Sequence, residues 1–170
     1  PIQSGDPEGG DSQTLKKLVS HSSFRILKEA YQFDAPLSPH AAAELEGKKI
    51  KVDSIALPKS NKPFIIEGAG GLLVPLNYEN NTICDLILKL DAQVIVVVKE
   101  YLGNINHTLL TIEHLRRCRI KIAGLVFVGE ELPYTFDIIS KSTNIQMLFR
   151  VPIFKTLNKN TILNFVSKLD

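Results

Sequence analysis

The chain has 170 residues, 44% hydrophobic and 22% charged, a balance that allows one sizeable core without disulfides or a structural metal. Its 20 basic and 18 acidic residues are dispersed and give a net charge of +2, which argues against a nucleic-acid partner. No signal peptide is recognised, and no apolar run approaches the roughly 18 residues of a membrane span. We therefore expect a cytoplasmic protein with no membrane partner.

The first half of the chain predicts a strand end followed by two helices. Residues 1–5 read as the end of a strand that runs into a loop. Residues 11–20 are predicted to form a helix behind an aspartate or serine cap. A second helix is predicted to have Ser38 as its N-cap, Pro39 at its first position and Gly47 as its stop.

The rest of the chain alternates strands and helices. Residues 64–67 are predicted to form a strand, and the β-branched run at 93–98 is typical of a strand covered on both faces. The other expected elements are helices at 82–90, 104–117, 133–142 and 160–169, and strands at 120–128 and 147–151. This alternation predicts an α/β fold, with a parallel sheet flanked by helices on both faces, in a single domain over residues 1–170.

The glycine-rich stretch EGAGG at residues 67–71 follows the predicted strand at 64–67. Ligands of open parallel sheets bind at the carboxyl ends of the strands, and glycines let the backbone approach a ligand closely. A carboxylate buried alone there costs several kcal/mol, so Glu67 requires water, a partner or a cation such as Mg²⁺. The pattern favours a ligand site, and a glycine-rich turn with a solvated glutamate is the alternative.

The cysteines and two of the histidines predict structural roles. Cys84 and Cys118 lie in apolar surroundings without metal-ligand or redox spacing, which favours buried thiols in a reducing compartment. His40 and His107 are expected to form structural hydrogen bonds rather than to act as acid or base.

Several motifs together carry a resemblance to a known family. They are PIQSGD at residues 1–6 with DS at 11–12, PLSPHAAAELEG at 36–47, EGAGGLLVPL at 67–76 and YLGNINHTLLT at 101–111. In this order and spacing they resemble dethiobiotin synthetase, an enzyme of the biotin pathway, over nearly the whole chain. The resemblance implies a P-loop-type α/β fold, a homodimer, and the use of ATP and Mg²⁺ to turn 7,8-diaminopelargonate and CO₂ into dethiobiotin.

The resemblance also implies roles for individual residues. It makes Asp11 and Glu67 ligands of Mg²⁺, and it makes Ser4 a contact of the diamine or its carbamate. The implied ATP-binding residues are Asp11, Glu67, Gly68, Ala69, Gly70, Val151 and Pro152. Without a ligand, Asp11 could be an ordinary helix N-cap and Ser4 a turn serine.

The segment from Gly103 to Asn106 has a second implied role. It lies between a predicted strand and a predicted helix, so its unpaired backbone amides and the positive helix end can bind an anion. In the family this helix start receives the carboxylate tail of the substrate from across the dimer interface, which makes Gly103, Asn104 and Asn106 substrate-binding residues. A plain helix cap is the alternative for Asn106.

The chain departs from the family pattern in two places. It lacks a G-x-x-x-x-G-K-[ST] loop, because the glycines at 5–10 are followed by Asp11 and Ser12, and the family lysine would precede Pro1. No catalytic residue is therefore assigned. We expect a strand, loop and helix to be missing, so that this chain alone is inactive; a catalytically dead relative is the alternative. Val128 replaces an adenine-reading asparagine, which leaves the nucleotide-base selectivity open.

Two other classes of protein remain alternatives. A non-catalytic α/β interaction module would keep the fold but lose Mg²⁺ binding. Another ATPase or synthetase of the P-loop fold could share EGAGG but would lack LGNINHTLLT at residues 102–111, which is the discriminating feature.

Overall fold

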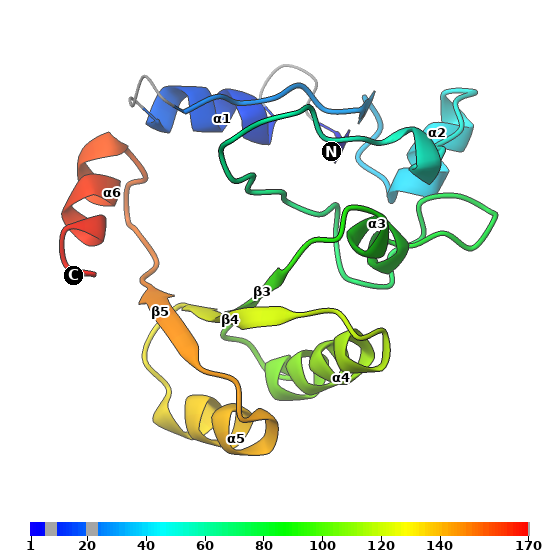
Figure 1. Cartoon of the computed structure of the whole chain (residues 1–170). Coiled ribbons are helices and arrows are strands. Elements are labelled where there is room, and N and C mark those ends of the chain that lie inside the picture. The colour runs from blue at the N-terminus through cyan, green and yellow to red at the C-terminus, as the bar shows by residue number, and fades with distance from the viewer. Residues whose placement is uncertain (6–9, 20–23, 170) are drawn as a thin grey trace. The chain divides into compact units, whose positions relative to one another are not determined.

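The computed structural model describes residues 1–5, 10–19 and 24–169 (Figure 1). The chain divides into two compact units, Pro1–Asp91 and Ala92–Asp170. Each unit contains one parallel sheet whose strands are connected through helices. This arrangement confirms the predicted α/β class, and the single domain over residues 1–170 stays a prediction.

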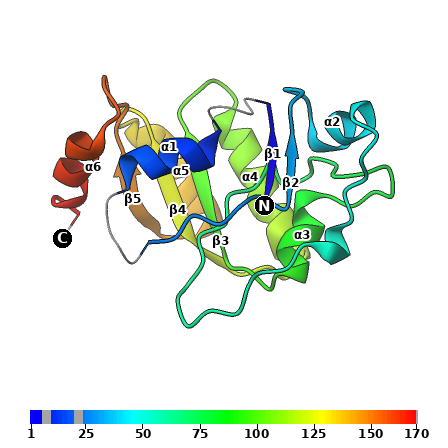
Figure 2. The same ribbon diagram turned by 90° about the horizontal axis from the view of Figure 1, so that it is seen from above.

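The first unit opens with a pair of short parallel strands, β1 (Ile2–Ser4) and β2 (Tyr31–Phe33), which run side by side in Figure 2. Between them in sequence lies α1 (Asp11–Leu18). The predicted helix at 11–20 is therefore confirmed over most of its length, while its last residue, Ser20, lies outside the described residues.

Two helices and a 3-10 turn complete the first unit, and their starts follow local signals. They are α2 (Pro39–Leu45), η1 (Val52–Ser54) and α3 (Ile83–Lys89). Ser38 occupies the N-cap of α2 and Pro39 its first position, as predicted. The Asp85 carboxylate accepts hydrogen bonds from the backbone and the hydroxyl of Thr82, both at 2.7 Å, and so closes the first turn of α3.

One apolar cluster forms the core of the first unit. The small side chains of Ala42 and Ala43 allow α2 to lie close to β1 and β2. The cluster consists of Ile2, Phe33, Ala42, Ala43, Ile50, Val52, Ile55, Leu76, Ile83 and Leu86.

The second unit is a regular succession of strands and helices. Its three parallel strands lie in the order β3, β4, β5. Helices α4 and α5 connect them, and α6 follows near the end of the chain. The bounds are β3 (Val94–Lys99), α4 (Asn104–Arg117), β4 (Ile122–Val128), α5 (Pro133–Thr143), β5 (Met147–Val151) and α6 (Lys159–Val166).

Helices α4 and α5 lie side by side on one face of this sheet (Figure 1). Successive side chains of a strand point to opposite faces, so a strand under one layer of helices buries alternate residues. Val96 and Val98 are buried, whereas Ile95 is 51% and Val97 63% exposed. The prediction that this strand is covered on both faces is therefore wrong, and Ile95 and Val97 lie on the uncovered face.

Strands β4 and β5 pack closely where Gly124 meets Leu148. A Cβ atom at position 124 would lie 2.5 Å from the Cγ of Leu148, well inside van der Waals contact. Position 124 therefore has no room for a side chain while Leu148 keeps its place.

The predicted strand at residues 64–67 is absent from this structure. No strand assigned in the described ranges includes these residues, and Ile65 is 92% exposed. A central strand is held by ladder hydrogen bonds to its neighbours, and a four-residue apolar run cannot specify such neighbours by itself. The strand prediction is wrong, and because Glu67 is exposed, its carboxylate can be hydrated without a protein partner.

Two further sequence expectations concern the cysteines and the membrane. Cys84 is buried, Cys118 is half-buried, and neither takes part in a disulfide in the described structure. Across residues 1–5, 10–19 and 24–169, no helix combines the length and apolar character needed to traverse a bilayer.

Candidate functional site

The predicted site residues are distributed over both units. Ser4, Asp11 and residues 67–70 belong to the first unit, whereas residues 103–106 and 151–152 belong to the second. Within each unit they lie at strand ends, turns and helix starts.

Ser4 is the last residue of β1, and its hydroxyl is unusual. The Oγ atom is buried and has no hydrogen-bond partner among the described residues. A serine that stabilised a turn would bond a nearby backbone group, so the turn interpretation does not describe Ser4. A buried hydroxyl without a partner costs free energy unless a ligand or water completes it.

Asp11 opens α1 but does not cap it. Gly10 occupies the N-cap, Asp11 is the first helical residue, and no side-chain cap hydrogen bond is formed. The N-cap interpretation of Asp11 is therefore wrong. The exposed carboxylate forms no salt bridge within the described ranges, so its oxygens remain accessible. The neighbouring Ser12 hydroxyl instead donates to the Glu29 carboxylate.

The glycine-rich turn after Glu67 is shaped by close contact. Gly70 has φ +84°, and a Cβ there would lie 2.9 Å from Val74 Cγ2, so position 70 requires glycine. The N–H of Val74 donates to the carbonyl of Gly71 at 3.0 Å, and the N–H of Cys84 donates to the carbonyl of Leu72 at 3.0 Å. The turn is thus fastened to the start of α3.

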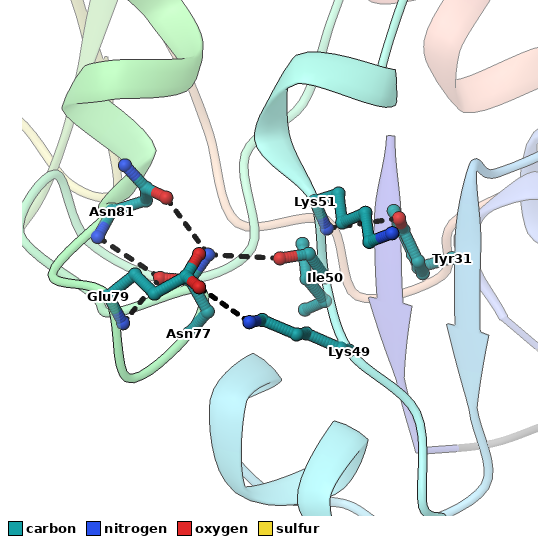
Figure 3. Close-up of polar contacts among 7 residues, drawn as sticks. All are labelled: Tyr31, Lys49, Ile50, Lys51, Asn77, Glu79 and Asn81. Atoms are coloured by element: carbon teal, nitrogen blue, oxygen red, sulfur yellow. Dashed lines mark hydrogen bonds and ion pairs between the residues drawn. The ribbon is translucent and has the colours of Figure 1, made fainter.

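A buried amide, Asn77, anchors the loop that follows this turn (Figure 3). Its Nδ2 donates to the carbonyl of Ile50 and to Oδ1 of Asn81, both at 2.9 Å. Its Oδ1 accepts from the backbone N–H groups of Glu79 at 3.0 Å and Asn81 at 3.2 Å. Asn77 therefore connects the loop to the segment before η1, and sequence reasoning missed it.

Electrostatics show which carboxylates of the first unit already have partners. The Lys48 ammonium, 2.7 Å from Glu46 Oε2, lowers the pKa of Glu46, and backbone amides add to this effect. The Glu44 carboxylate, which accepts a hydrogen bond from the Tyr78 hydroxyl, raises the pKa of Tyr78. Glu44 and Glu46 therefore serve the fold, in contrast to Asp11.

The helix start expected to bind an anion is present in the second unit. Gly103 is the N-cap of α4, and Asn104 is its first residue. Asn106 is exposed, and no side-chain cap hydrogen bond is formed, so the cap interpretation of Asn106 is wrong. His107 Nδ1 lies 2.5 Å from the Tyr101 hydroxyl, which confirms its structural hydrogen bond.

The carboxyl ends of β4 and β5 lie next to each other. Val128 is paired with Val151 in the parallel register, and the N–H of Gly129 donates to the carbonyl of Val151 at 3.0 Å. Val128, which replaces the family asparagine, and Val151, an expected nucleotide contact, therefore lie next to each other at the carboxyl ends of their strands. Pro152 follows directly and is exposed.

A half-buried ion pair at this edge was also missed. The carboxylate of Glu100, just after β3, lies 3.6 Å from the guanidinium of Arg150 on β5. The sequence carried a signal for it, because Glu100 is a carboxylate that follows Lys99 just after the apolar run at 94–98.

Parallel strands joined by helices are consistent with an α/β fold of the P-loop type. In agreement, residues 1–161 match a family model described as an AAA domain.

Curated relatives narrow the class to one family. ATP-dependent dethiobiotin synthetase BioD of Christiangramia forsetii is 46% identical over 151 residues, which are 89% of this chain and 72% of that relative. The enzyme of the same name from Cytophaga hutchinsonii is 42% identical over 170 residues, 99% of this chain and 82% of the relative. That of Nitrobacter hamburgensis is 38% identical over 162 residues, 95% and 76% respectively. The chain belongs to the ATP-dependent dethiobiotin synthetase family.

Proposed function

We propose that this protein carries out the ATP-dependent carboxylation and ring closure of 7,8-diaminopelargonate with CO₂ to form dethiobiotin. The observation that carries the proposal is the match to Cytophaga hutchinsonii dethiobiotin synthetase, 42% identical across 99% of the chain. Sequence identity that extends over both units is more specific evidence for a function than the fold is, because proteins with many different activities share this architecture.

In this reaction the main task of the protein is to position the diamine, CO₂ and ATP relative to one another. One amine of the substrate attacks CO₂ to give a carbamate, and a carbamate oxygen then attacks the γ-phosphorus of ATP with release of ADP. The second amine attacks the carbonyl carbon, and phosphate leaves as the ring closes. Each step depends on alignment and charge neutralisation rather than on a covalent enzyme intermediate. The buried hydroxyl of Ser4, which lacks a partner, suits a contact to the carbamate or the diamine.

Asp11 and Glu67 are suited to hold the Mg²⁺ of this reaction. Magnesium prefers carboxylate oxygens, and both residues are exposed without a salt bridge in the described part of the chain. When bound, the ion would offset the negative charge of the ATP phosphates. The backbone from Gly68 to Gly70 would pack against the nucleotide, and the family resemblance makes Val151 and Pro152 nucleotide-binding residues as well.

The carboxylate tail of the substrate would bind at the start of α4. Gly103 and Asn106 can supply backbone amides there, the exposed Asn106 side chain can add a hydrogen bond, and Asn104, whose N–H donates to the carbonyl of Tyr101, lies between them. A helix-end contact with an anion contributes about 0.3–1 kcal/mol, so it orients the tail more than it drives binding. In this proposal the enzyme is a cytoplasmic homodimer. The start of α4 in one subunit binds the carboxylate tail of the substrate whose reacting end is held by the other subunit.

The test is a defined assay of the full-length protein. It is incubated with 7,8-diaminopelargonate, bicarbonate, ATP and Mg²⁺, and dethiobiotin and ADP are quantified by mass spectrometry. We expect equimolar dethiobiotin and ADP, both lost when the diamine is omitted. ADP release without dethiobiotin, or no turnover at all, would refute the proposal.

A further inference from the structure

The side chain of Glu100 is the most constrained carboxylate described in the second unit. It is 9% exposed, and its Oε2 accepts a hydrogen bond from Asn104 Nδ2 at 2.9 Å. Its Oε1 is buried and accepts no hydrogen bond from any described residue. A carboxylate in such surroundings is retained only where a cation compensates its lost hydration.

Arg150 provides that cation from the neighbouring strand end. Its Nη1 lies 3.6 Å from Glu100 Oε1 and donates to the carbonyl of Glu130 at 2.8 Å. The guanidinium also lies 5.1 Å from the ring centre of Phe127. Arg150 is therefore held from several sides, and the pair is fixed rather than a mobile surface contact.

The backbone makes room for this arrangement at Gly129. A Cβ at that position would lie 3.3 Å from the Cβ and Cγ atoms of Glu100, and φ of Gly129 is +126°. The N–H of Glu100 donates to the carbonyl of Val128 at 3.1 Å. The ends of β3, β4 and β5 are thus joined around one carboxylate.

The other carboxylate oxygen of Glu100 accepts a hydrogen bond from Asn104, the first residue of α4. Asn104 is buried, and its Nδ2 divides its hydrogens between Glu100 Oε2 and the carbonyl of Lys99, the latter at 3.2 Å. The N–H of Asn104 donates to the carbonyl of Tyr101 at 3.1 Å, which closes the turn at 101–104. The amide donors of Asn104 therefore face the sheet.

We propose that Glu100 is a positioning residue for the substrate tail. By holding Asn104, it sets the orientation of the amides of α4 and of the exposed Asn106 toward the carboxylate. Asn104 then supports the turn rather than touching substrate through its amide donors. This inference rests on the proposed function, because it specifies how the tail site is kept in place.

The test compares Glu100→Gln with Glu113→Gln in the full-length protein. Glu113 is exposed on α4 and lies outside the turn at 101–104. Glutamine keeps the size of Glu100 but removes the charge opposite Arg150. We expect KM for the diamine to rise roughly two- to fivefold, the range that loss of a helix-end contact allows, with KM for ATP and kcat unchanged. Glu113→Gln should match the wild type.

A double substitution tests the ion pair itself. Arg150→Met removes the cation, and if the two residues act as a unit, Arg150→Met with Glu100→Gln should raise KM for the diamine no further than the more severe single variant. Multiplying effects would overturn a shared role.

Hydrogen exchange separates this inference from the proposed function. Exchange of the backbone amides at 101–107 should accelerate at least about fivefold in Glu100→Gln and remain unchanged in Glu113→Gln. If the wild type makes dethiobiotin but both KM and exchange are unchanged in Glu100→Gln, the positioning role is wrong and the function stands. If the wild type makes none, the proposed function fails, and faster exchange would still support control of the turn by Glu100.

Discussion

Replacing Asn77 by alanine tests whether one buried amide holds the loop behind the glycine-rich turn. The substitution removes two donated and two accepted hydrogen bonds, and it leaves the carbonyl of Ile50 without its partner (Figure 3). Because Ile50 is 0% exposed, water cannot readily replace the lost donor.

The size of the effect follows from which groups are left buried. An unsatisfied buried acceptor costs about 1–3 kcal/mol, which applies to the Ile50 carbonyl. The N–H groups of Glu79 and Asn81 lie in a loop nearer to solvent and can turn to water, so they add about 1 kcal/mol together. We expect the free energy of unfolding to fall by about 2–4 kcal/mol.

The measurement is urea denaturation of the full-length protein, followed by circular dichroism. Asn61→Ala is the control, because Asn61 is exposed, and it should change stability by less than about 0.5 kcal/mol. Asn77→Asp keeps the acceptor but loses the donor, so it should also be destabilising at pH 7. A loss below about 1 kcal/mol for Asn77→Ala, with unchanged denaturant dependence, would refute the reasoning.

Further substitutions address the candidate site. Glu67→Gln should raise the Mg²⁺ concentration needed for half-maximal rate, since it removes the charge that a hard cation prefers, and an unchanged Mg²⁺ titration would exclude Glu67 as a ligand. Asn106→Ala should raise KM for the diamine severalfold more than KM for ATP; equal changes would contradict a tail contact. At an Mg²⁺ concentration too low for Glu67→Gln to turn over, mixing it with inactive Asn106→Asp subunits should restore roughly a quarter of wild-type activity, and proven subunit exchange without recovery would place the tail site within one chain. Glu44→Gln should lower the raised pKa of Tyr78, seen as tyrosinate absorbance at lower pH; an unchanged titration would mean that Glu44 is not the cause.

Helices were predictable here because their signals are local. The helix expected at residues 104–117 is observed at Asn104–Arg117, and the one expected at 82–90 is observed at Ile83–Lys89, inside its two cap residues. Cap residues, glycine stops and apolar spacing lie within the segment itself, so they are read without knowledge of the rest of the chain. The strand at Val94–Lys99 was found from its β-branched run, which is also a local signal.

The two glutamates after apolar runs show where such reasoning stops. The argument that a strand-end carboxylate needs water, a partner or a cation was applied to Glu67, which is exposed, but it describes Glu100 better, because the half-buried carboxylate of Glu100 lies 3.6 Å from the guanidinium of Arg150. Each glutamate follows an apolar run, Glu67 directly and Glu100 after Lys99, and the difference is whether neighbouring strands pair with that run. That pairing is nonlocal, as is the meeting of Asn77 with Ile50, so neither could be read from the sequence.

The close contact between Gly124 and Leu148 restricts how this protein can evolve. A side chain added at position 124 would strike Leu148, so glycine is required only while position 148 carries a large residue. Shortening Leu148 first would open a path to alanine at 124, whereas the reverse order passes through a strained intermediate. The two positions are therefore expected to change together along a lineage, and in that order.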